Sequence, residues 1–380
     1  MSQQNIVVIV GEASGDAHAA RMIAELKQVS PQVNVKGIGG DKMRTAGADI
    51  VVDFSELAVM GLVEVLKRYC QIKKIFNQMV DLLKMDRPDL LVLVDYPGFN
   101  LKLAKEAKKL GIPVLYYISP KVWAWRAGRV KTIKKVVDHM AVLFPFEEPI
   151  YQNAGVPVSC VGHPLVDAVK RTLTTEQAKI KFGIEPEHQV IGLFPGSRRS
   201  EVEALLPIMI EAAERIHQRD NNVEVVLPLA LGLESSVVSP LLANTELPIK
   251  VIADDFYELT SACDAIVAAS GTVTLEIALL TIPHLITYRV APLTYQIFSR
   301  LVKIPNFGLC NIVTNKNLVL ELLQDDVTKE RLDKELTQFL TDPNSKAIAE
   351  DIRQQVLTAL GPTGGAKNAA QQVIKMLNET

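Results

Sequence analysis

The chain of 380 residues has few cysteines, and their spacing limits the kinds of site that it can contain. The four of them lie far apart and form no C-x-x-C pair: Cys70, Cys160, Cys263 and Cys310. This pattern is not typical of a zinc site or of a disulfide framework. We therefore expect thiols that stay reduced, as in the cytoplasm. We also expect that the protein uses no metal and no cofactor.

Long hydrophobic runs and an excess of one charge are also missing. No uninterrupted apolar stretch comes near the roughly 18 residues of a membrane-spanning helix, and the N-terminus has neither the basic start nor the apolar run of a signal peptide. The formal net charge is -2 at pH 7, which gives no overall attraction to nucleic acid. We expect a globular protein without a nucleic-acid partner, long enough for two domains.

A turn rich in phosphate-binding groups lies at the middle of the chain. The apolar run 190–194 stops at the Pro-Gly pair 195–196, and an acidic helix is predicted to follow. A turn of this kind points backbone N–H groups outward, and Ser197, Arg198 and Arg199 add further donors and positive charge. The combination indicates a phosphate site.

A second turn of the same kind follows the apolar run 265–269. Its sequence is Ser270-Gly271-Thr272, with Thr272 placed to cap a helix and Glu276 on the first turns of that helix. Two such turns in one half of the chain indicate one diphosphate ligand held from two sides. Two ordinary strand-to-helix turns are the alternative.

The first turn of the chain has a different character. Residues 6–10 form a β-branched run typical of a buried parallel strand, and the loop 11–16 then carries Glu12, Ser14 and Asp16. Two carboxylates would repel a phosphate, so this loop suits sugar hydroxyls better. In the alternative interpretation, Ser14 caps the next helix and Asp16 occupies its favourable first turn.

Asp95 follows another apolar run, which predicts a buried strand over residues 89–94. In open α/β sheets, ligands bind at the carboxyl ends of the strands. A carboxylate at that place is a candidate general base. The alternative role of Asp95 is to cap the helix that follows.

The helical region 54–85 has an apolar surface too wide for a single buried face. Val63, Leu66, Tyr69 and Ile72 belong to it, and basic residues are interleaved with them. This mixture suits a helix that lies on an anionic lipid surface. A core helix with a protein partner on its second face is the alternative.

Both tryptophans of the chain stand in the segment 119–126, close to several basic residues. Aromatic and basic side chains such as Trp123 and Arg126 suit a phosphorylated sugar or a membrane interface. A packed helix start explains them equally well. Both residues are therefore candidates for ligand contact.

The order of predicted elements indicates an α/β protein with two domains. Apolar runs alternate with helical patterns in both halves, which favours two open parallel sheets. We expect one domain over 1–165, a second over 166–345, and C-terminal helices over 346–380 that pack back on the first domain or on a partner subunit. Residues 318–324 and the helical patterns beyond them are expected to contain no strand.

Five segments spread over nearly the whole chain match one set of motifs. They read Gly-Glu-Ala-Ser-Gly-Asp (11–16), Glu-Leu-Ala-Val-Met-Gly (56–61), Ser-Pro followed by Val-Trp-Ala-Trp-Arg (119–126), Pro-Gly-Ser-Arg followed by Glu-Val-Glu (195–203) and Ala-Ser-Gly-Thr (269–272). In this order they resemble the motifs of the lipid-A-disaccharide synthase family. The members of this family are inverting glycosyltransferases of the GT-B fold. The resemblance implies two Rossmann-like domains, whose parallel sheets face a central cleft, and a helical C-terminal tail.

The resemblance also implies a reaction. The family joins UDP-2,3-diacylglucosamine to 2,3-diacylglucosamine 1-phosphate and releases UDP and the β-1,6-linked lipid A disaccharide 1-phosphate. Acylated substrates would explain an apolar helix on a globular fold. They imply an enzyme of the cytoplasm that is peripheral on the inner membrane, and the oligomeric state is left open, with a homodimer as one option.

The donor-side residues follow from the chemistry and from the resemblance together. An inverting transfer needs a base for the acceptor hydroxyl and donors for the leaving diphosphate. Asp95 can supply the first, and Ser197, Arg198 and the turn 270–272 can supply the second without a metal. By resemblance, Glu276 holds the nucleotide ribose and Asn311 lies near the donor sugar nucleotide.

The acceptor-side residues come from the first half of the chain. The resemblance places them toward the acceptor or the donor sugar: Glu12, Ser14, Asp16, Trp123 and Arg126. His18 and Arg199 fall outside the fixed family pattern, so we assign them no catalytic role.

Two other classes of function remain open from the sequence. A UDP-sugar epimerase of GT-B-like fold would share the donor half but would not need the apolar helix or the Trp123 segment. A non-enzymatic nucleotide-sugar sensor at the membrane would keep Arg198 and Glu276 but would not need Asp95. Release of UDP that depends on the acceptor separates a transferase from both.

Overall fold

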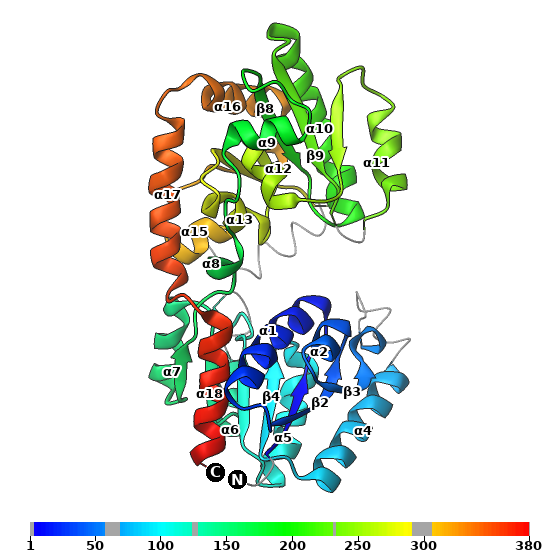
Figure 1. The fold of residues 1–380 in the computed structure, drawn as a ribbon, viewed down its shortest axis with the longest axis vertical. Helices are drawn as coiled ribbons and strands as arrows, with labels where there is room; N and C mark the ends of the chain where they lie inside the picture. The colour runs from blue at the N-terminus through cyan, green and yellow to red at the C-terminus, as the bar shows by residue number, and fades with distance from the viewer. Residues whose placement is uncertain (1–3, 58–68, 124–127, 231–232, 291–305, 380) are drawn as a thin grey trace. The chain divides into compact units, whose positions relative to one another are not determined.

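The computed structural model describes residues 4–57, 69–123, 128–230, 233–290 and 306–379 (Figure 1). The chain divides into two compact units. The first consists of Met1–Val166 together with Leu360–Thr380, and the second of Asp167–Ala359. The last residues of the chain therefore belong to the same unit as the first.

The first unit is built on a sheet of parallel strands in the order β3-β2-β1-β4-β5-β6-β7. The strands are β1 (Asn5–Ile9), β2 (Asn34–Gly39), β3 (Asp49–Asp53), β4 (Leu90–Val94), β5 (Val114–Tyr117), β6 (His139–Val142) and β7 (Val158–Cys160). Every residue of β4 and β5 is buried. Continuous apolar strands of this kind are expected where helices cover both faces of a sheet.

Helices cover both faces of this first sheet. They are α1 (Ala13–Val29), α2 (Asp41–Thr45), α4 (Tyr69–Asp86), α5 (Pro97–Lys109), α6 (Arg129–Val136), α7 (Glu148–Ala154) and α18 (Gly365–Glu379), with 3-10 turns at Phe54–Glu56 and Pro145–Glu147. On one face, α1 packs against α2 and α18, and Figure 1 shows α1 and α18 side by side. On the other face, α4, α5 and α6 share a core with Val7 and Ile9 of β1.

The second unit repeats this architecture with strands in the order β10-β9-β8-β11-β12-β13. The strands are β8 (Gln189–Phe194), β9 (Val223–Pro228), β10 (Ile249–Ile252), β11 (Ala265–Ala269), β12 (His284–Tyr288) and β13 (Glu321–Leu323). The helices are α9 (Thr175–Lys181), α10 (Arg199–Arg219), α11 (Ser235–Leu242), α12 (Phe256–Ala262), α13 (Val273–Leu279), α15 (Leu309–Thr314), α16 (Lys329–Thr341) and α17 (Ser345–Leu360), with a 3-10 turn at Gln324–Asp326. The short helix α8 (Leu165–Ala168) lies where the chain passes from one unit to the next.

Strand β13 corrects one expectation from the sequence, namely that residues 318–324 contain no strand. Glu321, Leu322 and Leu323 pair in parallel with Ile286, Thr287 and Tyr288 of β12. The strand is only three residues long, so too few positions exist for an alternating pattern to be visible in the sequence. The helical patterns predicted after it are present as α16, α17 and α18.

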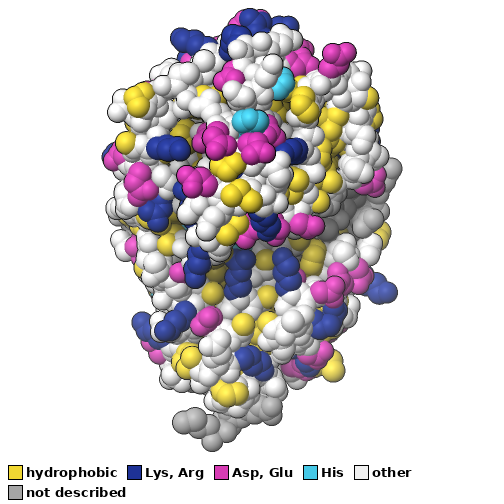
Figure 2. Space-filling model, turned by 45° about the horizontal axis from the view of Figure 1, so that its top comes forward, with side chains coloured by type: hydrophobic (Ala, Val, Ile, Leu, Met, Phe, Trp, Pro, Cys, Tyr) yellow, Lys and Arg dark blue, Asp and Glu magenta, His cyan; other side chains and the backbone are white. Residues whose placement is uncertain are grey.

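The expected fold class is confirmed. Both sheets have the strand order of a Rossmann-like domain, in which the order reverses between the first strand and the fourth. In the described part of the chain, no helix combines the length and the apolar character that crossing a bilayer would require. Acidic, basic and apolar side chains are interspersed on the face that Figure 2 shows.

Candidate active site

The candidate residues cluster at the topological switch point of each sheet. In the first unit β1 pairs with both β2 and β4, and Ile9 lies opposite Leu93, so the loops that begin at Gly11 and Asp95 leave the sheet side by side. In the second unit, Phe194 of β8 lies opposite Ala268 of β11. Ligands of open α/β sheets bind at the carboxyl ends of strands at this point.

Asp95 has an unusual backbone. Its φ is 46° and that of Tyr96 is 47°, so two consecutive residues other than glycine occupy the left-handed region before Pro97. Each costs about 1 to 3 kcal/mol, and such strain is concentrated at functional sites. The turn is held through the carbonyl oxygen of Asp95, which accepts hydrogen bonds from the Tyr116 hydroxyl (2.5 Å) and the Asn100 amide (2.8 Å).

The carboxyl group of Asp95 is not the cap of α5. The N-cap residue is Tyr96, whose side chain makes no capping hydrogen bond. Burial raises the pKa of Asp95 to about 6, and the negative charge of Glu12 acts in the same direction. The cations Lys121 and Arg129 and the backbone N–H of Tyr96 oppose this rise. A carboxyl group with a pKa near 6 can accept a proton at neutral pH.

The ring of Tyr96 joins the two loops of the first unit. It lies directly over Gly11, where any Cβ atom would overlap the ring, and its hydroxyl donates to the carbonyl of Leu57 at 3.1 Å. Glu12 is exposed and accepts a hydrogen bond from Ser14. The structure therefore brings Glu12, Ser14 and Asp95 to one edge of the sheet. Ser14 does not cap α1, whose N-cap residue is Glu12.

Asp16 points into the protein. It is 3% exposed, and its carboxylate accepts hydrogen bonds from the backbone N–H groups of Gly40 (2.7 Å), Lys42 (3.2 Å) and Met43 (3.3 Å). These groups stand at the start of α2, so Asp16 caps α2 from α1. The sequence placed Asp16 toward a sugar, but this geometry gives it the task of fixing the loop.

Of the remaining candidates in the first unit, some fall within the described residues and some do not. Trp123 is half-buried, with its ring edge against Phe146 at a centroid distance of 5.5 Å. Arg126, Val63 and Leu66 lie outside the described residues.

The lipid-facing candidates that remain lie on α4. Tyr69 is the first residue of this helix. Ile72 is half-buried and packs against the core of the first unit, which leaves only part of its side chain for lipid.

The turn after β8 is occupied by a side chain of its own helix. The Glu201 carboxylate accepts hydrogen bonds from the backbone N–H groups of Ser197 (3.2 Å) and Arg198 (3.3 Å) and pairs with the Arg198 guanidinium at 2.8 Å. Gly196 has a φ of 107° and passes under this carboxylate, where a Cβ atom would overlap it. A negatively charged group therefore already occupies the predicted phosphate-binding donors.

Arg198 and Arg199 differ in their surroundings. The side chain of Arg198 is 67% exposed and stands at the N-cap of the long helix α10, whose dipole also favours an anion. Arg199 points along the helix and pairs with Glu203 at 2.7 Å. Of the two arginines, Arg198 is the one whose guanidinium bonds the same carboxylate, that of Glu201, as the backbone N–H groups of the turn.

The turn after β11 is fixed by a hydrogen bond at Ser270 and has free space beside Gly271. The Ser270 hydroxyl donates to the carbonyl of Phe307 at 2.7 Å, while none of the described residues comes within 4 Å of the place where a Cβ atom of Gly271 would be. Thr272 is exposed at the N-cap of α13, but its side chain makes no capping hydrogen bond. The hydroxyl of Thr274 bonds the carbonyl of Gly271 instead.

Glu276 lies on the first turns of α13 and is half-buried. The hydroxyl of Tyr257 donates to its carboxylate at 2.9 Å. Burial raises the pKa of Glu276, and this hydrogen bond opposes the rise. A carboxylate fixed in this way can accept hydrogen bonds from a pair of hydroxyl groups.

Asn311 is a buried structural residue, with 1% of its surface exposed. Its amide nitrogen donates to the carbonyl of Val319 and to Glu321, both at 2.7 Å, and its oxygen accepts the N–H groups of Leu318 and Val319. Glu321 in turn accepts the N–H groups of the 307–308 segment, on which Ser270 rests. Asn311 therefore supports the second turn and has no group left for a ligand.

Several residues that shape these sites were not predicted. Tyr96 covers Gly11 and bonds Leu57, Tyr116 holds Asp95, and Tyr257 holds Glu276. Glu201 and Glu321 hold the two turns of the second unit. Two of them carried a signal in the sequence. Tyr96 precedes a proline, which disfavours helical dihedrals, and Glu201 belongs to the Glu-Val-Glu motif of residues 201–203. Within the described residues, no three His, Cys, Asp or Glu side chains are placed to hold a metal ion.

Comparison with known proteins adds a family match over the whole chain. A model of the lipid-A-disaccharide synthetase family matches residues 6–376. The lipid-A-disaccharide synthase of Geobacter sulfurreducens is 46% identical over 381 residues, which is 100% of this chain and 98% of that protein. The enzyme of the same name from Trichlorobacter lovleyi is 46% identical over 377 residues, which is 99% of this chain and 98% of that protein.

Solved structures are similar to the chain in fold. A putative UDP-N-acetylglucosamine 2-epimerase from Listeria monocytogenes aligns with a TM-score of 0.64 at 14% identity, over 100% of this chain and 98% of that one. A calicheamicin glycosyltransferase aligns with a TM-score of 0.62 at 14% identity, over 100% and 99%. At such low identity these likenesses concern the fold alone.

Proposed function

Because the chain belongs to the lipid-A-disaccharide synthetase family, we propose that it joins UDP-2,3-diacylglucosamine to 2,3-diacylglucosamine 1-phosphate. The products are UDP and the β-1,6-linked lipid A disaccharide 1-phosphate. The enzyme is a glycosyltransferase of lipid A biosynthesis. The proposal concerns the two substrates and the residues that act on them.

Asp95 acts as the general base in this proposal. The 6-hydroxyl oxygen of the acceptor forms the new bond to the anomeric carbon of the donor, while its proton passes to the Asp95 carboxylate and UDP departs with the electrons of the broken bond. The single observation that supports this role best is the placement of Asp95. It is a half-buried carboxyl with a pKa of about 6, on a strained backbone, at the switch point of the sheet.

Groups of the second unit bind the UDP part of the donor in this proposal. Arg198 and the N–H groups near Ser197 receive the diphosphate in place of Glu201, and the open turn 270–272 approaches it from the neighbouring strand. Glu276, fixed by Tyr257, accepts the ribose hydroxyls. Once Glu201 has left these donors, they stabilise the charge that develops on the leaving UDP.

The acylated substrates support a further proposal about location. We propose that the enzyme works in the cytoplasm on the inner-membrane surface, with Val63 and Leu66 toward lipid and Glu12, Ser14 and the Trp123 segment toward the sugars. The apolar and basic pattern of residues 62–74 supports contact with anionic lipid. A homodimer is compatible with this arrangement, and sedimentation of the purified enzyme measures it.

One variant tests the catalytic proposal. Asp95→Asn keeps the shape and the hydrogen-bonding atoms but removes the proton acceptor, so we expect turnover to fall by about 10² to 10⁴. The affinity for UDP and the melting profile should hardly change. Acceptor-dependent UDP release is the measurement, and a rate within a few fold of the parent would eliminate Asp95 as the base. UDP release without acceptor would instead favour the epimerase alternative, and binding of the donor without any UDP release would favour the sensor.

A further inference from the structure

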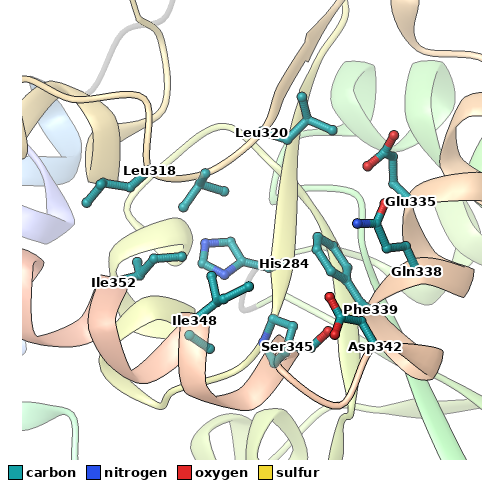
Figure 3. Close-up of a pocket in the computed structure, with 13 residues that line it drawn as sticks. His284, Leu318, Leu320, Glu335, Gln338, Phe339, Asp342, Ser345, Ile348 and Ile352 are labelled. Atoms are coloured by element: carbon teal, nitrogen blue, oxygen red, sulfur yellow. The ribbon is translucent and has the colours of Figure 1, made fainter.

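A pocket of about 190 Å³ lies in the second unit, away from the proposed donor residues (Figure 3). It is formed by the residues at the beginning of β12, by the segment that leads into β13, and by facing sides of α16 and α17. The donor residues follow the carboxyl ends of the parallel strands, whereas His284 is the first residue of β12. The pocket therefore opens at the opposite edge of the sheet.

His284 contributes an unsatisfied hydrogen-bond acceptor to this pocket. The side chain is 5% exposed, and its Nδ1 lies 2.9 Å from the carbonyl oxygen of Ile282, so Nδ1 carries the hydrogen and donates it. Nε2 is then an acceptor, and it is buried without a partner among the described residues. Burial lowers the pKa of His284 to about 4, so the ring is neutral at pH 7.

Two of the other polar side chains around the pocket are already engaged, and Gln338 and Ser345 complete its polar lining. Glu335 pairs with Arg331 at 3.0 Å, and Asp342 accepts the backbone N–H of Asn344 at 2.9 Å. Most of the remaining lining is apolar, and Figure 3 shows the imidazole of His284 reaching in beside these side chains: Leu318, Leu320, Phe339, Ile348 and Ile352. The buried Nε2 of His284 therefore lacks a hydrogen-bond donor, and most of the surface around it is apolar.

The size and chemistry of the pocket limit what can fill it. A buried water needs two to four polar partners, and Nε2 of His284 is the one buried side-chain atom of this lining that lacks a partner among the described residues. Neither lysine nor arginine lines the pocket, so an anion has no counter-charge there. An ammonium ion would lose its hydration among the apolar side chains, and the Glu335 and Asp342 carboxylates of the lining already have partners. A cavity of about 150 Å³ is known to accommodate benzene, so the volume here fits a molecule of ring size.

We propose that this pocket binds an uncharged molecule of ring size that carries one O–H or N–H donor, with the donor bonded to Nε2 of His284. Phenol is the simplest member of this class. The site is separate from the sugar-nucleotide site, so its occupancy is independent of the proposed reaction. Helix α17, which forms one wall, is also the last helix before the chain returns to the first unit.

Calorimetry on the full-length protein with phenol and benzene as probes tests this proposal. We expect phenol to bind more tightly than benzene to the parent protein. In His284→Phe, which keeps an aromatic ring but removes the acceptor, phenol should lose roughly tenfold in affinity while benzene is unaffected. His139→Phe is the matched control, because His139 also begins a strand but bonds Ser159 in the other unit.

A second variant tests the location without touching the core. Ile348 lines the pocket but is 53% exposed, so Ile348→Trp should fold and should block both probes. The histidine anchor is refuted if phenol and benzene bind equally, or if His284→Phe leaves phenol affinity unchanged. Absence of binding by either probe, or binding that Ile348→Trp does not alter, refutes the pocket itself. Acceptor-dependent UDP release should persist in both variants, which separates this test from that of the catalytic proposal.

Discussion

Two neighbouring carboxyl groups govern the electrostatics at the strand ends of the first unit. Burial raises the pKa of Asp95 to about 6, and the charge of Glu12 adds to the rise. A base must be ionised to work, so kcat/KM should fall as the pH drops through about 6. Because the folded-state pKa lies above the ordinary value, ionising Asp95 also lowers the free energy of unfolding as the pH rises from about 4 to 6.

The pH profile of Glu12→Gln follows from this coupling. Removing the negative charge of Glu12 should lower the pKa of Asp95, so the acid limb of kcat/KM should move to lower pH. Glu106→Gln on the same chain is a suitable control, since Glu106 pairs with Lys109 at the far end of α5. Rate measurements from pH 4.5 to pH 8 decide the matter, and an acid limb at the same pH in all three proteins would contradict it.

Arg198 and Arg199 offer a matched pair for the donor side. Arg198→Ala should weaken UDP binding by roughly 10- to 100-fold, because a charge-assisted hydrogen bond to a phosphate is worth about 1.5 to 3 kcal/mol. Arg199→Ala removes the same charge from the next residue, where it pairs only with Glu203, and should have little effect. Calorimetry measures the affinity of both variants for UDP. An equal loss of affinity in the two variants would mean that Arg198 contributes only through its charge and not through a direct contact with the diphosphate.

The residue scale is also where the sequence was least informative. Asp16 and Asn311 look like ligand-binding residues in their motifs, yet the first bonds Gly40, Lys42 and Met43 and the second bonds Glu321. These partners lie 10 to 27 positions away in the sequence from the residues that they bond, so no local sequence pattern predicts them. The loop that a polar residue stands on can be predicted, but the direction of its side chain depends on neighbours brought in by the fold.

At the scale of elements, the turn between β8 and α10 depends on glycine. Gly196→Ala should lower the free energy of unfolding of the second unit by about 1 to 3 kcal/mol, because alanine must adopt a φ of 107° under the Glu201 carboxylate. Gly98→Ala is the control. Gly98 lies in α5 with nothing within 4 Å of an added Cβ, so alanine there should be neutral or stabilising by up to about 1 kcal/mol.

Calorimetric melting of both glycine variants distinguishes the two cases. If Gly196→Ala melts at the temperature of the parent, the turn tolerates a side chain and Glu201 can move away from it. That result would also weaken the idea that the turn is held ready for an anion.

Whole elements were predicted well where they are long and buried on both faces. Strands β4 and β11 stand out in the sequence as apolar runs, and the structure buries all of their residues. Strands β7 and β13 were missed because each has three residues and lies at an edge of its sheet. Partial burial at an edge leaves little hydrophobic signal, and pairing with the neighbouring strand decides the conformation instead.

At the scale of the whole molecule, contact with lipid can be measured directly. Val63→Ser combined with Leu66→Ser should reduce sedimentation of the enzyme with anionic vesicles and leave the melting profile intact. Val29→Ser combined with Ile180→Ser is the control, because both residues are exposed apolar side chains on other surfaces, at 63% and 62%. Equal vesicle binding by parent and variant would contradict the lipid-facing assignment, and loss of cooperative melting would indicate a core helix.

The return of the chain to its first unit has a consequence for its synthesis. Helix α18 packs on α1, Gln4 donates to the carbonyl of Leu377, and Asn368 donates to that of Val161. A ribosome releases the first 166 residues long before the last 21, so the first unit emerges with the α1 surface uncovered. The second unit, whose chain is continuous, can fold before the first is complete. The first unit can therefore cover the surface of α1 only after α18 has been synthesised. A chain that ends before α18 would leave this surface exposed.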